Sequence, residues 1–265
     1  MPKPSPNASS NPWHDWRENV REVAIVIVGV LIALLAQEIV QGWEWQQKIA
    51  AADDAMKREM FWDNGPEMLE RISIQPCINA QLDAIRAAVE ANRPRAEIVG
   101  LVDRLYVSYV SYDTVAYRDV SASDVPIHMP RTRENAWTQA YAMMPLVDAT
   151  DAQETVDAAR IKALKRTGGP LSDAEQIALL QAIEEVRGDG ARIMSGIHWT
   201  MQAMPQLHGT FDKARLDQAL QFARLHYGSC IRPVPADWPA THLPPLPKGI
   251  APGLATNVVS PWQTS

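Results

Sequence analysis

Six histidines, at positions 14, 128, 198, 208, 226 and 242, are the residues best suited to bind a metal or to move protons. His198 and His208 are the closest useful pair, but ten residues separate them and no acidic partner stands at the spacing of metal ligands. Ser195 lies close to His198, yet it lacks the motif that exposes a nucleophilic serine. We therefore expect no metal site, no cofactor and no serine nucleophile.

Adjacent acidic residues are the second candidate group, in the pairs Asp53-Asp54 and Glu184-Glu185. Neighbouring residues on a helix point about 100° apart, so neither pair converges as an acid and base couple, and both are expected on solvated faces. The chain also has no phosphate-binding glycine loop, no dinucleotide-binding glycine motif and no zinc-protease motif. No catalytic residue is predicted, which favours a non-enzymatic protein and leaves an enzyme of unrecognised type as the least favoured reading.

Cys77 and Cys230 are the only cysteines. An even pair in a domain that we expect outside the cytoplasm predicts a disulfide between the first soluble helix and the end of the fold. A loop of that length would be stabilised by about 4–5 kcal/mol in the chain-entropy model. The alternative is two unrelated buried thiols.

The element expected to position everything else is an apolar stretch near the N-terminus. Val23–Ala36 carries no polar side chain. As a helix it rises only about 21 Å, which is short of a hydrocarbon core of about 30 Å. The apolar character resumes at Ile39 and Val40, so that 23–40 is long enough to span. We interpret it as a transmembrane anchor.

Two other readings of this stretch fit less well. A cleaved signal peptide needs small residues before its cleavage site, whereas the best candidate site has Leu34 at the −3 position. A buried helix of a soluble protein would show polar residues at helical spacing, and none occurs from Val23 to Ala36. An uncleaved anchor is therefore favoured.

The residues around the span predict its orientation. Arg17 and Arg21 lie just before it, and Trp43 and Trp45 follow it at the depth of the membrane interface. Because basic residues beside a span favour the cytoplasmic side, we expect a cytoplasmic N-terminus, a span in the bacterial inner membrane and a periplasmic C-terminal domain.

Small residues on the span offer a contact for another helix. Gly29 and Ala33 form a small-xxx-small pair that would permit close helix packing, and thus a homo-oligomer, although such pairs also arise by chance in apolar helices.

Length and composition divide the chain into four expected parts: a polar leader (1–14), the anchor helix (15–45), a helical extracytoplasmic domain (46–230) and a Pro-rich tail (231–265). The net charge is −6, and no basic run exists to bind a nucleic acid. The expected partners are the lipid bilayer and a protein of the cell envelope.

The soluble part has helical periodicity almost throughout, which predicts an all-α fold with an irregular helical bundle. Ile78, Leu82, Ile85 and Val89 share one face of a helix that ends before Pro94, and Trp137 begins a similar face that ends at Pro145. A break or kink is expected at 63–66, and interruptions at Pro76, Gly188 and Gly190. Helix starts are expected at Thr150, Ser172 and Thr210, and a helix end at Gly228. Residues 106–117 are expected as helix or ordered loop, and 121–130 as a loop.

Methionines and tryptophans of the domain are expected mainly as flexible core filling, at positions 137, 143, 144, 194, 199, 201 and 204. The same side chains could instead line a groove for a hydrophobic ligand.

The span and its flanks, from Arg21-Glu22 through VAIVIVGVLIALLAQEIVQGW, together with the segment Asn135-Ala136-Trp137 and the turn at Pro145-Leu146, resemble a group of uncharacterised bacterial single-pass membrane proteins. The likeness covers the anchor well and the rest loosely. It implies a membrane-anchored helical protein and transfers no catalytic residue.

These observations predict a single-pass inner-membrane protein whose helical domain acts as a protein-interaction or structural module in the envelope. The alternative is a membrane-anchored sensory domain that binds a hydrophobic small ligand in a groove between its helices.

Overall fold

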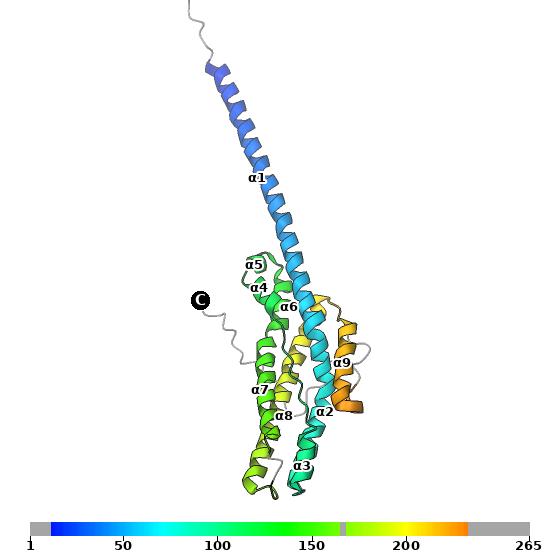
Figure 1. Cartoon of the computed structure of the whole chain (residues 1–265). Helices are drawn as coiled ribbons and strands as arrows, with labels where there is room; N and C mark the ends of the chain where they lie inside the picture. The colour runs from blue at the N-terminus through cyan, green and yellow to red at the C-terminus, as the bar shows by residue number, and fades with distance from the viewer. Residues whose placement is uncertain (1–11, 165–167, 233–265) are drawn as a thin grey trace, which may run out of the picture. The chain divides into compact units, whose positions relative to one another are not determined.

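The computed structural model describes residues 12–164 and 168–232. All regular structure within these ranges is helical, which confirms the all-α prediction (Figure 1). The expected Pro-rich tail lies outside the described residues from position 233 onward. The chain divides into two compact units, Met1–Ala51 and Ala52–Ser265, which we describe separately.

The first unit consists, where it is described, of a single helix. Helix α1 (Pro12–Lys57) supplies it and continues into the first residues of the second unit. Large apolar side chains from Val23 to Val40 are between 53% and 73% exposed. An 18-residue window here has a mean hydropathy of 2.7, and none of it is buried. This one helix of the described chain is long and apolar enough to cross a membrane.

The helix that enters the second unit does not break at 63–66 or at Pro76, but next to the first of these positions it changes from an α-helix to a π-helix. The π-helix η1 (Arg58–Asn64) follows α1 and leads directly into α2 (Gly65–Glu90), which contains Pro76. Pro66 lacks an N–H, so it leaves the carbonyls of Phe61 and Trp62 without their helical donors. The backbone N–H of Asp212 donates to Phe61 O (3.3 Å), and the Arg215 guanidinium donates to Trp62 O (3.0 Å). These tertiary donors satisfy the freed carbonyls and keep the helix continuous.

The second unit is a bundle in which α2, α7 and α8 run side by side, with α9 against α2 (Figure 1). The remaining elements, in chain order, are α3 (Arg95–Val102), α4 (Val115–Ser121), α5 (Val125–His128), α6 (Arg131–Tyr141), α7 (Met144–Lys162), α8 (Asp173–Ala203), η2 (Met204–Leu207), α9 (Lys213–Tyr227) and η3 (Gly228–Cys230). Residues 106–114 form an ordered non-helical segment before α4, and the expected loop at 121–130 contains the short helix α5.

Glycines in α8 permit close packing rather than ending helices, so the predicted interruption at Gly188 and Gly190 is wrong. A Cβ on Gly190 would lie 2.6 Å from Gln75 Nε2 and 3.1 Å from Glu154 Oε1. A Cβ on Gly196 would overlap a methyl group of Val147 in α7. The two positions without side chains allow α8 to approach α2 and α7 closely.

The predicted helix ends are correct in part. Ser172 and Glu175 form the expected capping box at the start of α8. Thr150 instead lies inside α7, where its hydroxyl donates to Leu146 O (2.7 Å), and Pro145 stands in the first turn of α7 rather than ending a helix. Asp212, and not Thr210, caps α9 through the N–H groups of residues 214 and 215.

The main core lies between α2, α3, α7, α8 and α9, around the predicted face of Ile78, Leu82, Ile85 and Val89. A disulfide joins Cys77 of α2 to Cys230, with their Cα atoms 5.6 Å apart, at the end of the described chain. Of the predicted methionine and tryptophan core residues, 137, 144, 194, 201 and 204 are buried, whereas Trp199 is 41% exposed.

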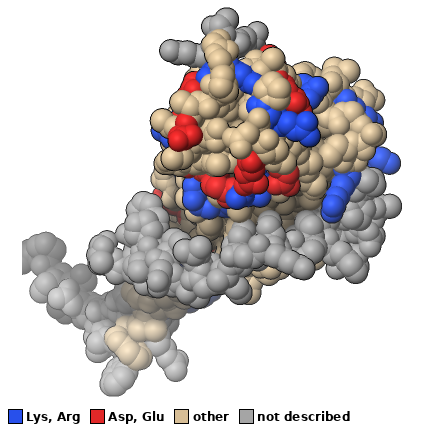
Figure 2. Space-filling model, turned by 90° about the horizontal axis from the view of Figure 1, so that it is seen from below, with Lys and Arg blue, Asp and Glu red and all other residues tan. Residues whose placement is uncertain are grey.

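Lys and Arg side chains alternate with Asp and Glu side chains on the end of the molecule seen in Figure 2. Ion pairs between the helices include Arg86–Glu184 (2.7 Å) and Arg160–Glu185 (2.8 Å). The predicted Glu184-Glu185 pair thus faces outward, each carboxylate paired with its own arginine.

Candidate binding groove

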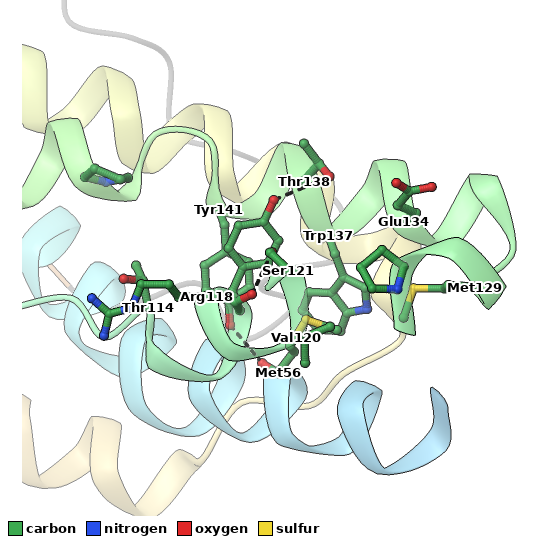
Figure 3. A pocket seen from close by; sticks show the side chains of 13 residues that line it. Met56, Thr114, Arg118, Val120, Ser121, Met129, Glu134, Trp137, Thr138 and Tyr141 are labelled. Atoms are coloured by element: carbon green, nitrogen blue, oxygen red, sulfur yellow. Dashed lines mark hydrogen bonds between the residues drawn. The ribbon is translucent and has the colours of Figure 1, made fainter. Parts of the chain in front are cut away.

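A cavity of about 450 Å³ opens in the second unit between the end of α1 and helices α4, α5 and α6 (Figure 3). Most of its lining is apolar or aromatic. The lining residues are Met56, Thr114, Tyr117, Arg118, Val120, Ser121, Pro126, Met129, Glu134, Trp137, Thr138, Tyr141 and Pro145. We call this cavity the aromatic groove.

Three aromatic rings form its wall. Tyr117 of α4 stacks on Tyr141 of α6, with ring centroids 4.4 Å apart and planes within 8°. Trp137 lies one turn before Tyr141, with centroids 6.0 Å apart, and is only 1% exposed. Tyr141 is also buried, at 2% exposed, so the three rings pack mainly against the protein and border the cavity rather than face solvent.

Asp53 fixes the aromatic wall to α1. Its carboxylate accepts hydrogen bonds from Trp137 Nε1 (3.0 Å) and from the Arg133 guanidinium, and it pairs with Lys57 (3.0 Å). Burial would raise the pKa of Asp53, but the hydrogen bonds from Arg133, Lys57 and Trp137 outweigh it and lower the pKa. The prediction that Asp53-Asp54 forms a solvated face is therefore wrong for Asp53, which is 4% exposed.

Glu59 holds Tyr141 and the start of α4 together. One carboxylate oxygen accepts the hydroxyl hydrogen of Tyr141 (2.8 Å), and the other accepts the backbone N–H of Ala116 (2.6 Å) in the first turn of α4. Helix α4 has no side-chain cap of its own, so Glu59 supplies the missing acceptor. Burial, together with the neighbouring charge of Glu59, raises the pKa of Tyr141 and keeps its hydroxyl protonated.

The π-helix explains how one element reaches two parts of the groove. Asn64 holds the segment before α4 through two hydrogen bonds to Asp113. The side-chain amide N–H of Asn64 donates to the backbone carbonyl of Asp113 (2.7 Å), and its amide oxygen accepts the backbone N–H of Asp113 (2.8 Å). In an α-helix, Glu59 and Asn64 would point about 140° apart, whereas i→i+5 hydrogen bonding brings residues five apart close to one face. The π-helix therefore allows both side chains to hold the same chain segment.

Polar groups stand at the groove's rim. Arg118 is exposed, and Glu134 pairs with Arg131 (2.8 Å), whose side chain is 83% exposed. Thr138 is exposed, with its hydroxyl 3.5 Å from that of Tyr117. These groups can select or orient a bound molecule. Their arrangement is that of a binding site, with apolar walls and a few polar contacts at the mouth.

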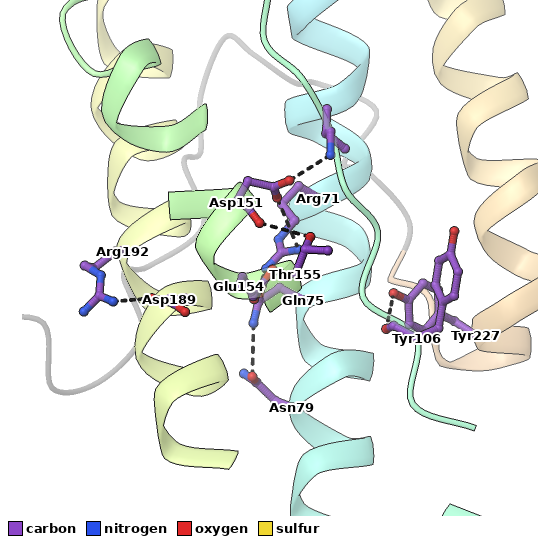
Figure 4. A network of polar contacts seen from close by, with 11 residues as sticks. Arg71, Gln75, Asn79, Tyr106, Asp151, Glu154, Thr155, Asp189, Arg192 and Tyr227 are labelled. Atoms are coloured by element: carbon purple, nitrogen blue, oxygen red, sulfur yellow. Dashed lines mark hydrogen bonds and ion pairs between the residues drawn. The ribbon is translucent and has the colours of Figure 1, made fainter. Parts of the chain in front are cut away.

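A second group of ionisable side chains lies inside the bundle (Figure 4). Arg71 of α2 is fully buried and pairs with Glu154 of α7 (2.6 Å), while Asp151 lies 4.0 Å from it and accepts the N–H of Val110 (2.8 Å). Asp189 of α8 pairs with Arg192 at the edge of this group. The cluster joins α2, α7 and the segment before α4, which is a structural role.

Burial sets the protonation of the acids around this cluster. It raises the pKa of Glu70 and of Glu67 to about 7, and that of Asp151 to about 6. Arg71 opposes the shift at Glu70 and Asp151. Burial and a hydrogen bond to Asp157 also raise the pKa of Asp189 to about 6. Among the described residues, no three His, Cys, Asp or Glu side chains are arranged to hold a metal ion.

Of the residues singled out in the sequence, Trp137 and Pro145 line the groove, whereas the anchor residues and the cysteines do not. Arg17 and Arg21 belong to α1, as do the exposed Gly29 and Ala33. Trp43 is 61% exposed, whereas Trp45 lies beneath the ammonium of Lys48, which is 4.4 Å from its ring centre. Cys77 lies near the middle of α2 and is bonded to Cys230, and neither cysteine lines the groove.

Sequence reasoning missed Asp53, Glu59 and Asn64 as positioning residues. Their partners lie about 50 to 85 positions away, at Asp113, Trp137 and Tyr141, and no local pattern encodes such pairs. The helical spacing of Trp137 and Tyr141 was visible, but it indicated a core face rather than a wall.

Searches of family models, of curated proteins and of solved structures found no match to this chain.

Proposed function

We propose that this chain is a single-pass membrane protein whose helical domain binds a partner protein of the bacterial cell envelope. The aromatic groove is the observation that carries this proposal. Its apolar walls open at the surface, and long-range polar contacts at Asp53 and Glu59 hold them in shape. A rigid, preformed apolar site binds at a lower entropic cost than one that must order on binding.

The apolar surface around the groove supports a macromolecular partner. Val115, Ile127 and Leu146 each stand next to a lining residue in sequence and are 49%, 77% and 49% exposed. A small molecule inside the groove would leave these side chains in water. A protein segment could fill the groove and cover them as well.

The anchor and its orientation complete the proposal. Arg17 and Arg21, before the apolar stretch of α1, support a cytoplasmic N-terminus and with it a periplasmic bundle. An oxidising compartment would also maintain the disulfide of Cys77 and Cys230.

Topology is tested with reporters fused after Trp45 and at the C-terminus of the full chain. We expect both reporters to be active only on the periplasmic side. Cytoplasmic activity of either would overturn the compartment and would remove the oxidising environment from the argument.

The partner is tested by placing a photoreactive amino acid at Thr138, which is exposed at the groove's mouth. The matched control carries it at Glu97, an exposed position on α3. After irradiation of intact cells, we expect adducts with an envelope protein at Thr138 and none of the same mass at Glu97. Identical adducts at both positions, or none at either, would count against a groove-binding partner.

A small apolar molecule is the second candidate occupant, because a volume of about 450 Å³ lies within the range of ligand pockets. The full chain, purified in mild detergent, would then carry an apolar compound that solvent extraction and mass spectrometry detect. Thr138→Trp would fill the mouth and remove the compound, whereas the control Asp217→Asn on α9 would retain it. Self-association through Gly29 and Ala33 stays a prediction, tested by crosslinking in the membrane.

A further inference from the structure

We propose that the disulfide between Cys77 and Cys230 is a thiol-exchange site: a small thiol that carries carboxylate groups opens it at Cys230 and so frees the C-terminal end of α9 from α2. The inference does not depend on the aromatic groove or on its partner. Its basis is the unequal exposure of the two cysteines, the cavity beside them and the cations that line that cavity.

The two cysteines differ in their access to solvent. Cys77 is 2% exposed on α2, whereas Cys230 is exposed at the end of η3. A thiolate opens a disulfide by attacking one sulfur, and the other sulfur leaves as a thiolate. Attack from solvent is therefore directed to Cys230, with Cys77 as the leaving group inside the bundle.

A cavity of about 660 Å³ borders the disulfide, where the end of α9 meets α2 and the segment that follows α3. Its lining includes both cysteines, Gln81 of α2, Tyr106 and Tyr227. This volume lies within the range of pockets that hold a small molecule. A thiol of the size of glutathione therefore has room beside the bond that it attacks.

Two cations in the lining favour a thiol that carries negative charge. Arg104 and Lys162 are exposed, and neither pairs with an acidic side chain among the described residues. Asp103 is the one acidic residue in the described lining, so the cations outnumber it. Arg104 and Lys162 would attract the carboxylates of the thiol and stabilise its thiolate form, which is the form that reacts.

The exchange is a reduction in two steps. The thiolate forms a bond to Cys230 Sγ, the bond between the two cysteines breaks, and its electron pair leaves with Cys77 Sγ, which then takes a proton from water. A second thiolate attacks the sulfur of the bound thiol and releases Cys230 as a thiolate, which is protonated in turn. The protein disulfide gains two electrons, and two molecules of the small thiol become one disulfide.

Reduction would free one end of α9. The start of this helix is held by hydrogen bonds to the π-helix η1. At its end, the hydroxyl of Tyr227 donates to Tyr106 O (2.7 Å; Figure 4), the disulfide follows, and the N–H of Arg232 donates to Ser73 O (3.3 Å). Without the covalent bond, two hydrogen bonds and the apolar contacts remain, so this end of α9 opens more often.

Reduction rates with thiols of opposite charge test the role of the cavity. The full chain in detergent is mixed with glutathione, which is negatively charged, or with cysteamine, which is positively charged, and mass spectrometry follows the loss of the disulfide. The double variant Arg104→Gln, Lys162→Gln should lower the ratio of the glutathione rate to the cysteamine rate by about fivefold, through the loss of two charges screened by physiological salt. The control Arg93→Gln, Lys213→Gln removes two exposed charges elsewhere and should leave this ratio unchanged.

The position of the adduct and the mobility of α9 are measured on the wild-type chain. Reactions quenched in acid should carry glutathione on Cys230 and a free thiol at Cys77. After full reduction, amide hydrogen exchange should become faster in residues 220–230 and stay unchanged at the capped start of α8.

Three results would overturn the proposal. One is a disulfide that glutathione reduces only when the chain unfolds, which identifies a purely structural bond. Another is an adduct on Cys77, or a rate ratio that the cavity variant and its control change equally. The third is full reduction with no faster exchange in residues 220–230, which removes the release of α9. None of these results bears on a partner in the aromatic groove.

Discussion

Replacing Glu70 with glutamine should stabilise the protein at neutral pH and leave its stability unchanged in acid. Glu70 is 8% exposed on α2, next to Arg71. Burial raises its pKa from 4.5 to about 7 despite the opposing charge of Arg71. The folded protein therefore binds this proton more tightly than the unfolded chain does. The stability that protonated Glu70 contributes is complete below pH 4.5 and is lost as the pH rises through 7.

The size of the effect follows from this shift. A difference of about 2.5 pKa units corresponds to an upper limit of about 3 kcal/mol between pH 4 and pH 7.5. Glutamine has nearly the shape of the protonated carboxyl and cannot ionise. Glu70→Gln should thus raise the unfolding free energy by up to about 3 kcal/mol at pH 7.5 and by about zero at pH 4. For a domain of this size the thermal midpoint would move by roughly 6–12 °C.

The assay is thermal unfolding of the full chain in detergent, followed by tryptophan fluorescence at pH 4, 5.5 and 7.5. Asp217→Asn, an exposed change on α9, is the control for the loss of one negative charge. The wild-type protein should itself lose stability as the pH rises, because Glu67 and Asp151 are shifted in the same direction. A Glu70→Gln variant that is less stable at pH 7.5, or equally altered at all three pH values, would refute the reasoning.

Three further predictions concern packing and positioning. Gly196→Ala should lower the unfolding free energy by about 1–3 kcal/mol, because the added methyl group overfills the contact with α7. Gly188→Ala should raise the unfolding free energy by up to about 1 kcal/mol, because its added Cβ has no atom closer than 3.9 Å. Denaturant titration measures both changes. Cys77→Ser should lower the unfolding free energy by about 2–5 kcal/mol under oxidising conditions and leave the unfolding free energy unchanged under reducing conditions. Asp53→Asn should lower the unfolding free energy by about 1–3 kcal/mol and shift the fluorescence emission of Trp137. An unchanged emission spectrum would contradict this prediction.

The sequence was sufficient for features that depend on neighbouring residues. The periodicity around Ile78 and Leu82 located the main core face, and Ser172 with Glu175 marked the start of α8. The sequence was insufficient where a contact with a distant residue compensates for a proline or glycine that would otherwise interrupt a helix. Pro66 does not end its helix, because residues near the start of α9 bind the carbonyls it frees, and Gly190 was misread because the side chain of Gln75 occupies its missing volume.

The groove shows the same limit at the level of function. Its aromatic wall can be seen in the spacing of Trp137 and Tyr141, but spacing alone predicts only that the two side chains share a face. Both side chains are buried, and they border the groove because Asp53 and Glu59 hold α6 and α4 at fixed positions on one continuous helix. Each carboxylate accepts more than one hydrogen bond from the elements around the groove. Replacing either carboxylate would therefore remove a charge and also release the helix that it holds in position. A site of this kind is encoded in pairs of residues far apart in the chain, and for that reason its geometry becomes visible only in the folded domain.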